Sequence, residues 1–97
     1  MTRFVLSTRR VVPLVRTDEY RQAWERIRAL AEAVGGRAWL FRAVQRDDQF
    51  IEFVEGAPDS VLRAPELVSA REALEAEFGY GVAEEWEEAP VQVEEER

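Results

Sequence analysis

The fold of this chain is decided by the stretch Gly36-Arg-Ala-Trp-Leu-Phe-Arg-Ala-Val-Gln-Arg-Asp-Asp-Gln-Phe-Ile-Glu-Phe-Val-Glu55. Two apolar runs rich in aromatic residues flank the acidic pair Asp47-Asp48. Such a pattern is typical of two antiparallel strands joined by a short turn. We therefore predict a β-hairpin over residues 36–55 and expect the other elements of the chain to cover it.

The pairing of the two strands depends on the length of the turn. A two-residue loop at Asp47-Asp48 would pair Arg46 with Gln49, Val44 with Ile51, Arg42 with Phe53, and Leu40 with Glu55. The opposite face of the hairpin would then carry Trp39, Phe41, Ala43, Gln45, Phe50, Glu52 and Val54. Both faces are largely apolar, whereas a sheet with one exposed side shows one polar face. We therefore expect helices on one face and a second covering structure on the other.

The segment before the hairpin predicts a strand and a helix. Residues 4–12 alternate as a strand does, and Pro13 follows them. Apolar residues then recur at steps of three and four, which predicts an amphipathic helix with Thr17 as its N-cap and Gly35-Gly36 at its end. The apolar positions of this helix are Tyr20, Ala23, Trp24, Ile27, Leu30, Ala31 and Val34.

The segment after the hairpin predicts a second helix and a last strand. Residues 60–64 suit a short helical turn, and a longer helix is expected to begin at Pro65 and to stop at Gly79. Residues 80–89 form a predicted fourth strand whose acidity suits the edge of a sheet. Residues 90–97 are expected to form an acidic C-terminal tail.

This order of elements predicts the fold class. Strand, helix, strand, strand, helix, strand is the ferredoxin-like split βαβ arrangement, an α+β fold in which two helices cover one face of a four-stranded antiparallel sheet. We expect a single domain over residues 1–89. A chain of 97 residues supplies only one core, so the other apolar sheet face is most simply covered by a second copy of the chain. The expected partner is therefore the chain itself, in a homodimer formed through the sheet face.

Composition excludes several kinds of chemistry. The sequence has no Cys, no His and no Lys, so it offers no His or Cys ligands for zinc or haem and no histidine base. We predict no cofactor and no metal site, and expect Glu84, Glu85, Glu87 and Glu88 to form a solvated strand edge.

The net charge of −7 argues against binding to nucleic acid or to an anionic membrane surface. The chain shows no signal peptide or membrane span, and we expect it in the cytoplasm.

The elements taken together resemble a known group of proteins. A helix ending in Gly35-Gly36, the strand segment Gly36 to Arg42, the strand Phe50 to Glu55, an Ala-rich helix and a short closing strand are similar to the dimeric α+β barrel superfamily. The antibiotic-biosynthesis monooxygenase-like branch is the part of the superfamily that the chain resembles. The resemblance implies a homodimer whose sheets pack into a barrel, with a small-molecule cavity beside each sheet.

The sequence also departs from that branch. Its cofactor-independent oxygenases are known for Asn, Trp, Arg and Tyr in the cavity, and haem-degrading relatives depend on His. This chain has neither Asn nor His, and Gly56 stands where the branch has a Trp. Haem-dependent and His-dependent activities are therefore disfavoured, and no catalytic residue is transferred from the branch.

Two charged residues of the hairpin are the catalytic candidates. Glu52 lies in mid-strand among Phe41, Phe50 and Val54, and a buried carboxylate without a partner can act as a general acid or base. The alternative is a glutamate that is paired with an arginine or exposed at an edge. Arg42 is expected on the opposite face, where it would hold an anionic substrate group or reach a glutamate of a partner chain.

Aromatic residues are the candidates for ligand binding. They are Trp24, Trp39, Phe41, Tyr80 and Trp86. Tryptophans at these spacings can line a cavity for a flat molecule, or they can simply form core or interface. The hydroxyls of Tyr20 and Tyr80 could orient a ligand, although packing explains them equally well.

Two functional classes are compatible with these residues. One is a non-catalytic dimer that binds a small apolar metabolite or a protein partner. The alternative is a cofactor-independent monooxygenase-like enzyme that acts on a small apolar or aromatic substrate. We favour the non-catalytic dimer, because the chain lacks the commonest catalytic groups, and leave open whether the protein is an enzyme.

Overall fold

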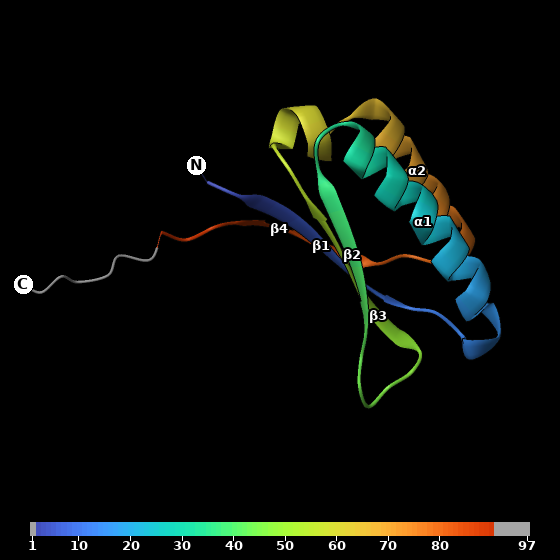
Figure 1. Cartoon of the computed structure of the whole chain (residues 1–97). Helices are drawn as coiled ribbons and strands as arrows, with labels where there is room; N and C mark the ends of the chain where they lie inside the picture. The colour runs from blue at the N-terminus through green and yellow to red at the C-terminus, as the bar shows by residue number, and fades with distance from the viewer. Residues whose placement is uncertain (1, 91–97) are drawn as a thin grey trace, which may run out of the picture.

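The predicted ferredoxin-like order is confirmed by the structure, a computed structural model that describes residues 2–90. The strands are β1 (Phe4–Val11), β2 (Arg37–Arg42), β3 (Gln49–Glu55) and β4 (Val82–Glu87). The helices are α1 (Thr17–Ala33) and α2 (Pro65–Phe78), with single helical turns at Leu14–Arg16 and Pro58–Leu62. The strands form one antiparallel sheet in the order β2-β3-β1-β4 (Figure 1).

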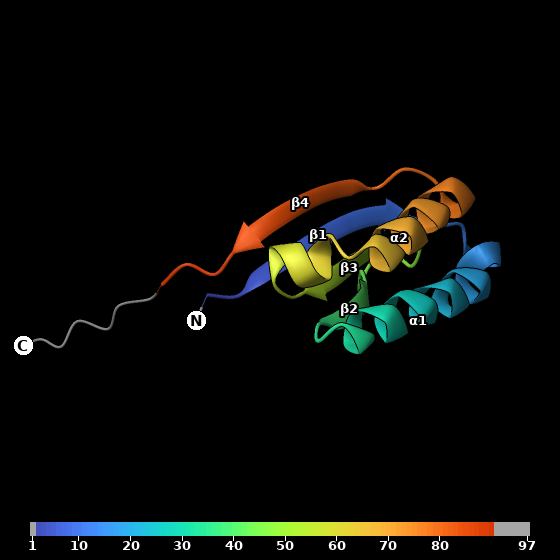
Figure 2. The same ribbon diagram turned by 90° about the horizontal axis from the view of Figure 1, so that it is seen from above.

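The core lies between the sheet and the two helices, which run side by side over one sheet face (Figures 1 and 2). The fully buried large side chains include Tyr20 and Ile27 from α1 and Leu67 from α2. The predicted apolar stripe of the first helix is confirmed for Tyr20, Trp24, Ile27 and Ala31, which are buried, whereas Val34 is the C-cap residue and is exposed. Burying such a stripe against a sheet is the main source of stability for a helix of this length.

The ends of the helices follow the sequence signals, with one difference. α2 begins with Pro65 and stops at Gly79, whose φ of +98° favours glycine. Thr17 was expected to be the N-cap of α1, but it is the first helical residue and makes no capping hydrogen bond. The turn Leu14–Arg16 precedes it, so that Arg16 takes the N-cap position.

Arg16 links the beginning of α1 to the end of α2. Its Nη1 donates to the carbonyl of Glu77 at 2.8 Å and its Nη2 lies 2.7 Å from Glu77 Oε2. The guanidinium carbon also lies 4.5 Å from the centroid of the Phe78 ring. Hydrogen bonds to Glu19 and Glu77 raise the pKa of Arg16. These contacts fix the C-terminal end of α2, where the chain turns into β4.

The hairpin register differs from the one expected. A turn does form at Asp47-Asp48, with the Gln49 amide donating to the Arg46 carbonyl at 3.1 Å. However, β2 ends at Arg42, and the strands pair Arg42 with Phe50 and Leu40 with Glu52. This is a shift of an odd number of residues, which exchanges the two faces of β2 relative to β3.

The corrected register changes which side chains lie together. Arg42 shares the helix-covered side with Glu52 instead of lying opposite to it. Phe41 shares the other side with Phe53, and the two rings meet edge to face at 5.8 Å. The cause is the loop 43–48, which is longer than the two residues expected.

The sheet face that the helices leave open is largely apolar, as expected. Strand pairing places on it Val5, Val11, Trp39, Phe41, Ile51, Phe53, Val82 and Trp86. Trp86 is anchored by a hydrogen bond from its indole nitrogen to the Ser7 hydroxyl at 2.7 Å. Phe41 and Trp86 are each about half exposed, at 54% and 50%. Isolated domains rarely expose such a continuous apolar surface.

Part of the expected C-terminal tail lies outside the described residues, which end at Pro90. None of the helices in residues 2–90 combines the length and the apolar character that crossing a bilayer requires.

Candidate functional site

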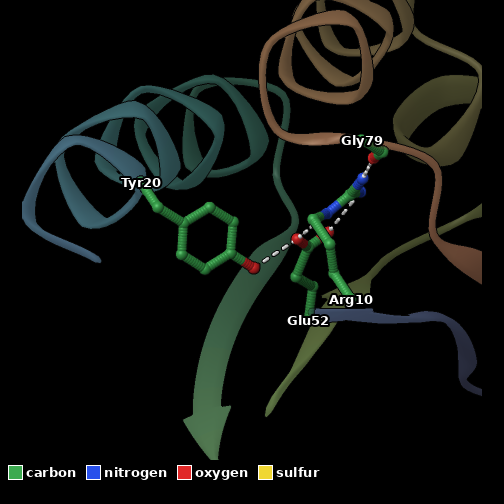
Figure 3. Close-up of polar contacts among 4 residues, drawn as sticks. All are labelled: Arg10, Tyr20, Glu52 and Gly79. Atoms are coloured by element: carbon green, nitrogen blue, oxygen red, sulfur yellow. Dashed lines mark hydrogen bonds and ion pairs between the residues drawn. The ribbon is translucent and has the colours of Figure 1, made fainter. Parts of the chain in front are cut away.

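A cluster of three polar side chains lies inside the core, between the sheet and α1 (Figure 3). Arg10 of β1 donates from Nε to Glu52 Oε2 at 2.8 Å and from Nη2 to Glu52 Oε1 at 3.3 Å. The Tyr20 hydroxyl of α1 also donates to Glu52 Oε2. The three side chains are almost completely buried, with 6% of Arg10, 4% of Glu52 and none of Tyr20 exposed.

Strand alternation and aromatic packing bring these groups together. Thr8 pairs with Glu52 and Arg10 with Phe50, so Arg10 and Glu52 are diagonal neighbours on the helix-covered face. The Tyr20 ring packs edge to face against Phe50 and Phe78, with centroids 4.9 and 5.4 Å away. These two rings hold the phenol in position over the carboxylate.

The electrostatics of the cluster favour a stable charge pair. Burial raises the pKa of Tyr20, and the adjacent Glu52 charge raises it further, so the phenol stays protonated and donates its hydrogen bond. Burial alone would lower the pKa of Arg10, but the hydrogen bonds and charge of Glu52 outweigh it, and the pKa is raised. Glu52 thus has the arginine-paired arrangement, the alternative to the unpaired carboxylate that a general base requires.

Arg10 also binds the connection between α2 and β4. Its Nη1 donates to the Gly79 carbonyl, as Figure 3 shows. A Cβ on Gly81 would lie 2.5 Å from Thr8 Cγ2 and 3.2 Å from the guanidinium carbon of Arg10. Glycine at position 81 therefore allows the backbone to pass directly over β1, so that the connection covers Arg10.

A hollow of about 530 Å³ lies at the end of the sheet where β1 and β2 finish and β3 begins. Its polar lining residues are Arg9, Arg10, Arg42, Gln49 and Tyr80. Its other lining residues are Val11, Phe41, Ala43, Phe50, Ile51, Phe78, Gly79 and Val82. The lining therefore combines an apolar wall with positive charge and contains no carboxylate.

The structure brings together only part of the residues singled out from the sequence. Arg42, Phe41 and Tyr80 line this hollow, whereas Glu52 lies behind Arg10 and does not line it. Trp24 belongs to the core and is 3% exposed. Trp39 and Trp86 lie on the open sheet face, beside a smaller hollow of about 350 Å³.

Sequence reasoning missed Arg10, Arg9 and Gln49 as parts of the site. The signal for Arg10 was present, because it alternates with Leu6 and Thr8 on the face that the helices cover. A charged residue at an inward strand position requires a buried partner. Arg9 and Gln49 have no local signal, since their place in the hollow depends on the packing of distant segments.

The acidic residues at the edge do not form a cluster suited to a metal ion. Glu84, Glu85, Glu87 and Glu88 are exposed, and successive strand positions point to opposite faces. Within residues 2–90, no three acidic side chains lie close enough together to hold a cation.

The buried phenol gives an expected alkaline limit of stability. An unfolded tyrosine ionises near pH 10, and the pKa of Tyr20 is raised above this value by folding. Above about pH 10 the unfolded chain therefore releases a proton that the folded chain keeps. We expect the free energy of unfolding to fall there by about 1.4 kcal/mol per pH unit, with no such loss below pH 10.

Denaturant unfolding from pH 8 to pH 11 measures this effect. The chain contains two tyrosines and neither Lys nor Cys, so few other groups titrate in this range. Tyr20→Phe should abolish the alkaline loss, whereas Tyr80→Phe, at a residue that is 81% exposed, should retain it. Identical pH profiles for Tyr20→Phe and the unmodified chain would contradict the role assigned to Tyr20.

Comparison with known proteins supports the fold but does not assign the chain to a family. No model of a protein family matches the sequence, and no curated protein matches it either. Several solved structures do match. SnoaB from Streptomyces nogalater, a cofactor-independent oxygenase, superposes with a TM-score of 0.66 at 19% identity, covering 98% of this chain and 98% of that one.

Two further structures give the same result. A conserved protein from Methanosarcina mazei has a TM-score of 0.72 at 11% identity, with 89% of this chain and 92% of that chain covered. A proposed antibiotic biosynthesis monooxygenase from Caulobacter crescentus has a TM-score of 0.69 at 18% identity, with 92% and 91% covered. The chain thus has the same fold as these structures, which include antibiotic biosynthesis monooxygenase-like proteins, and this confirms the structural resemblance and the ferredoxin-like fold class predicted from the sequence.

Proposed function

We propose that this protein is a homodimeric α+β barrel that binds a small apolar molecule without transforming it. The observation that carries the proposal is the lining of the hollow at the end of the sheet, which is apolar and basic and has no acidic side chain. The buried carboxylate of Glu52 is engaged by Arg10 and Tyr20. A carboxylate base is therefore missing from the place where a ligand would sit.

The homodimer is supported by the open sheet face. Its strand positions carry two arginines, Arg9 and Arg37, and two glutamates, Glu55 and Glu84, so its formal charge is balanced although the chain carries −7. A two-fold contact places the same surface on both sides, and a balanced surface avoids repulsion between like charges. Its aromatic residues are of the kind enriched at the centre of interfaces.

The same contact would help to complete the ligand site. Arg9, Phe41, Ile51 and Val82 line the hollow and also belong to the open face. In the proposed dimer, a second subunit on this face would cover part of the hollow. Covering a ligand in this way removes apolar surface from water, which is the main source of affinity for a small apolar molecule.

A second candidate is a cofactor-independent oxygenase acting on a small apolar or aromatic substrate. It is favoured by the fold, which is shared with SnoaB over almost the whole chain. In this case Arg42 and Tyr80 would be the polar contacts to the substrate, since both line the hollow. The substrate itself would have to supply an ionised, electron-rich group, because the lining contains no carboxylate to remove its proton.

Three measurements on the full chain test these proposals together. Sedimentation at micromolar concentration should give a dimer, and calorimetric titration with the neutral probe 2-naphthylmethanol should give saturable binding. Oxygen consumption with a panel of phenols and quinols should stay at the background rate. Monomers would contradict the dimer, an absence of binding would contradict the ligand site, and oxygen uptake would favour the oxygenase.

A further inference from the structure

We propose that the hollow at the end of the sheet takes a small aromatic carboxylate, and that Arg42 is the residue that binds its carboxylate group. This inference rests on the proposed ligand-binding function and specifies the chemical class of the ligand. It is carried by three features of the described residues: the charge of the lining, the partners of its arginines, and the nature of its walls.

The charge of the lining is opposite to that of the chain. The sequence contains 20 acidic and 13 basic residues, yet the hollow is lined by Arg9, Arg10 and Arg42 and by no acidic residue. Low-dielectric walls strengthen the potential of such charges within a concave site. An anion is therefore attracted to this hollow, although the net charge of −7 repels anions from the molecule as a whole.

Two of the three arginines are less suited to binding a ligand. Arg10 is already held by Glu52, with three of its N–H groups directed at Glu52 and the Gly79 carbonyl. Arg9 lies on the open sheet face, paired with Ile51 and Val82, where the proposed second subunit would cover it. The charge of Arg10 is thus already neutralised by Glu52, and Arg9 would have to share its donors with the second subunit, so both are less well placed than Arg42 to be the main anion contact.

Arg42 is the arginine that is free for this role. It is the last residue of β2, which Figure 1 shows at the edge of the sheet. It is exposed, and strand pairing places it on the helix-covered side. Within residues 2–90, no carboxylate lies within 4 Å of its guanidinium nitrogens. A guanidinium presents parallel N–H donors that match the two oxygens of a carboxylate, and such bidentate pairs are the strongest hydrogen bonds of this type.

The walls of the hollow favour an aromatic body for the ligand. Phe41, Phe50, Phe78 and Tyr80 all line it. Phe50 and Phe78 are fixed by edge-to-face packing on Tyr20, at 4.9 and 5.4 Å, so the wall near Arg42 is rigid. Aromatic rings pack well against other aromatic rings, edge to face or offset. The volume of about 530 Å³ is also typical of small-molecule sites.

Two probes of similar size separate the contribution of the carboxylate to binding from that of the aromatic ring. We expect 2-naphthoate to bind the full chain about tenfold or more tightly than neutral 2-naphthylmethanol, as measured by calorimetric titration at low salt. Added salt should weaken naphthoate binding and leave naphthylmethanol binding unchanged, because screening acts on charge. Arg42→Gln should remove the preference for the anion while the neutral probe binds as before.

A matched control lies on α1, outside both the hollow and the open sheet face. Arg26→Gln removes a likewise exposed arginine that does not line the hollow, and should keep the preference for 2-naphthoate. Circular dichroism of each variant checks that the fold is retained.

Contrary results would distinguish a failure of the anion site from a failure of the proposed ligand-binding function. Equal binding of both probes to the unmodified chain would overturn the anion site and leave the apolar ligand site intact. A preference that survives in Arg42→Gln and disappears in Arg9→Gln would overturn the assignment to Arg42. If neither probe binds, the proposed function itself fails.

Discussion

Replacing Glu52 by glutamine is expected to lower the free energy of unfolding by about 3–5 kcal/mol, the largest loss expected from a single polar change in this protein. Glutamine has nearly the size of glutamate but no charge, so it leaves the Arg10 guanidinium buried without a counter-charge. Arg10 is 6% exposed and is therefore poorly placed to recover solvation. Urea unfolding followed by circular dichroism, at one fixed protein concentration, measures the change.

Two further variants show whether the loss comes from the buried pair. Glu72→Gln removes a carboxylate from an exposed position of α2 and should change the unfolding free energy by less than about 0.5 kcal/mol. The double variant Arg10→Met/Glu52→Leu removes both charges and should be more stable than Glu52→Gln. The interpretation would be wrong if Glu52→Gln unfolded at the same urea concentration as the unmodified chain.

Replacing Phe53 by glutamate is expected to convert the proposed dimer into monomers at micromolar concentration. Phe53 lies near the middle of the open face, paired with Ser7 on one side and Trp39 on the other. A two-fold interface would bury the new carboxylate from each subunit without a partner, at a cost of several kcal/mol. The dissociation constant should therefore rise about a hundredfold or more, which sedimentation over a range of concentrations measures.

The matched control places the same charge outside the proposed interface. Val44 is 99% exposed in the loop between β2 and β3, so Val44→Glu should leave the dissociation constant unchanged. Phe53 is only partly buried in the isolated chain, and the variant is expected to remain folded by circular dichroism. Equal sedimentation of Phe53→Glu and Val44→Glu as dimers would show that the open face is not the contact surface.

The elements of this fold could be predicted from local patterns because each carries its own signal. Pro65 and Gly79 mark the ends of α2, and the steps of three and four in α1 mark the side that is buried. The register of the hairpin has no such local signal, because it depends on the number of residues in the loop between its two strands. The Asp47-Asp48 turn was predicted correctly, but no residue in the loop 43–48 indicates that β2 has already ended at Arg42.

The candidate site depends on long-range pairing, and sequence reasoning reached it only in part. Glu52 was recognised as a residue with two possible environments, and the choice between them depended on Arg10, which is 42 positions away. Arg42 was assigned to the wrong side of the sheet because the register was wrong. The hollow is lined by residues of β1, β2, β3 and the α2–β4 connection. A local sequence pattern does not show which of these distant segments lie next to one another.

The position of β1 in the sheet has a consequence for the order in which the molecule can assemble. This strand is the first in the chain but lies between β3 and β4, with Phe4 paired to Glu87 at almost the opposite end of the described residues (Figure 1). While the polypeptide emerges from the ribosome, β1 cannot pair on both sides until β3 and β4 have been synthesised. Contacts between residues so far apart in the sequence slow folding. Until β4 has been synthesised, β1 remains an edge strand, and the nascent chain is open to pairing with another chain.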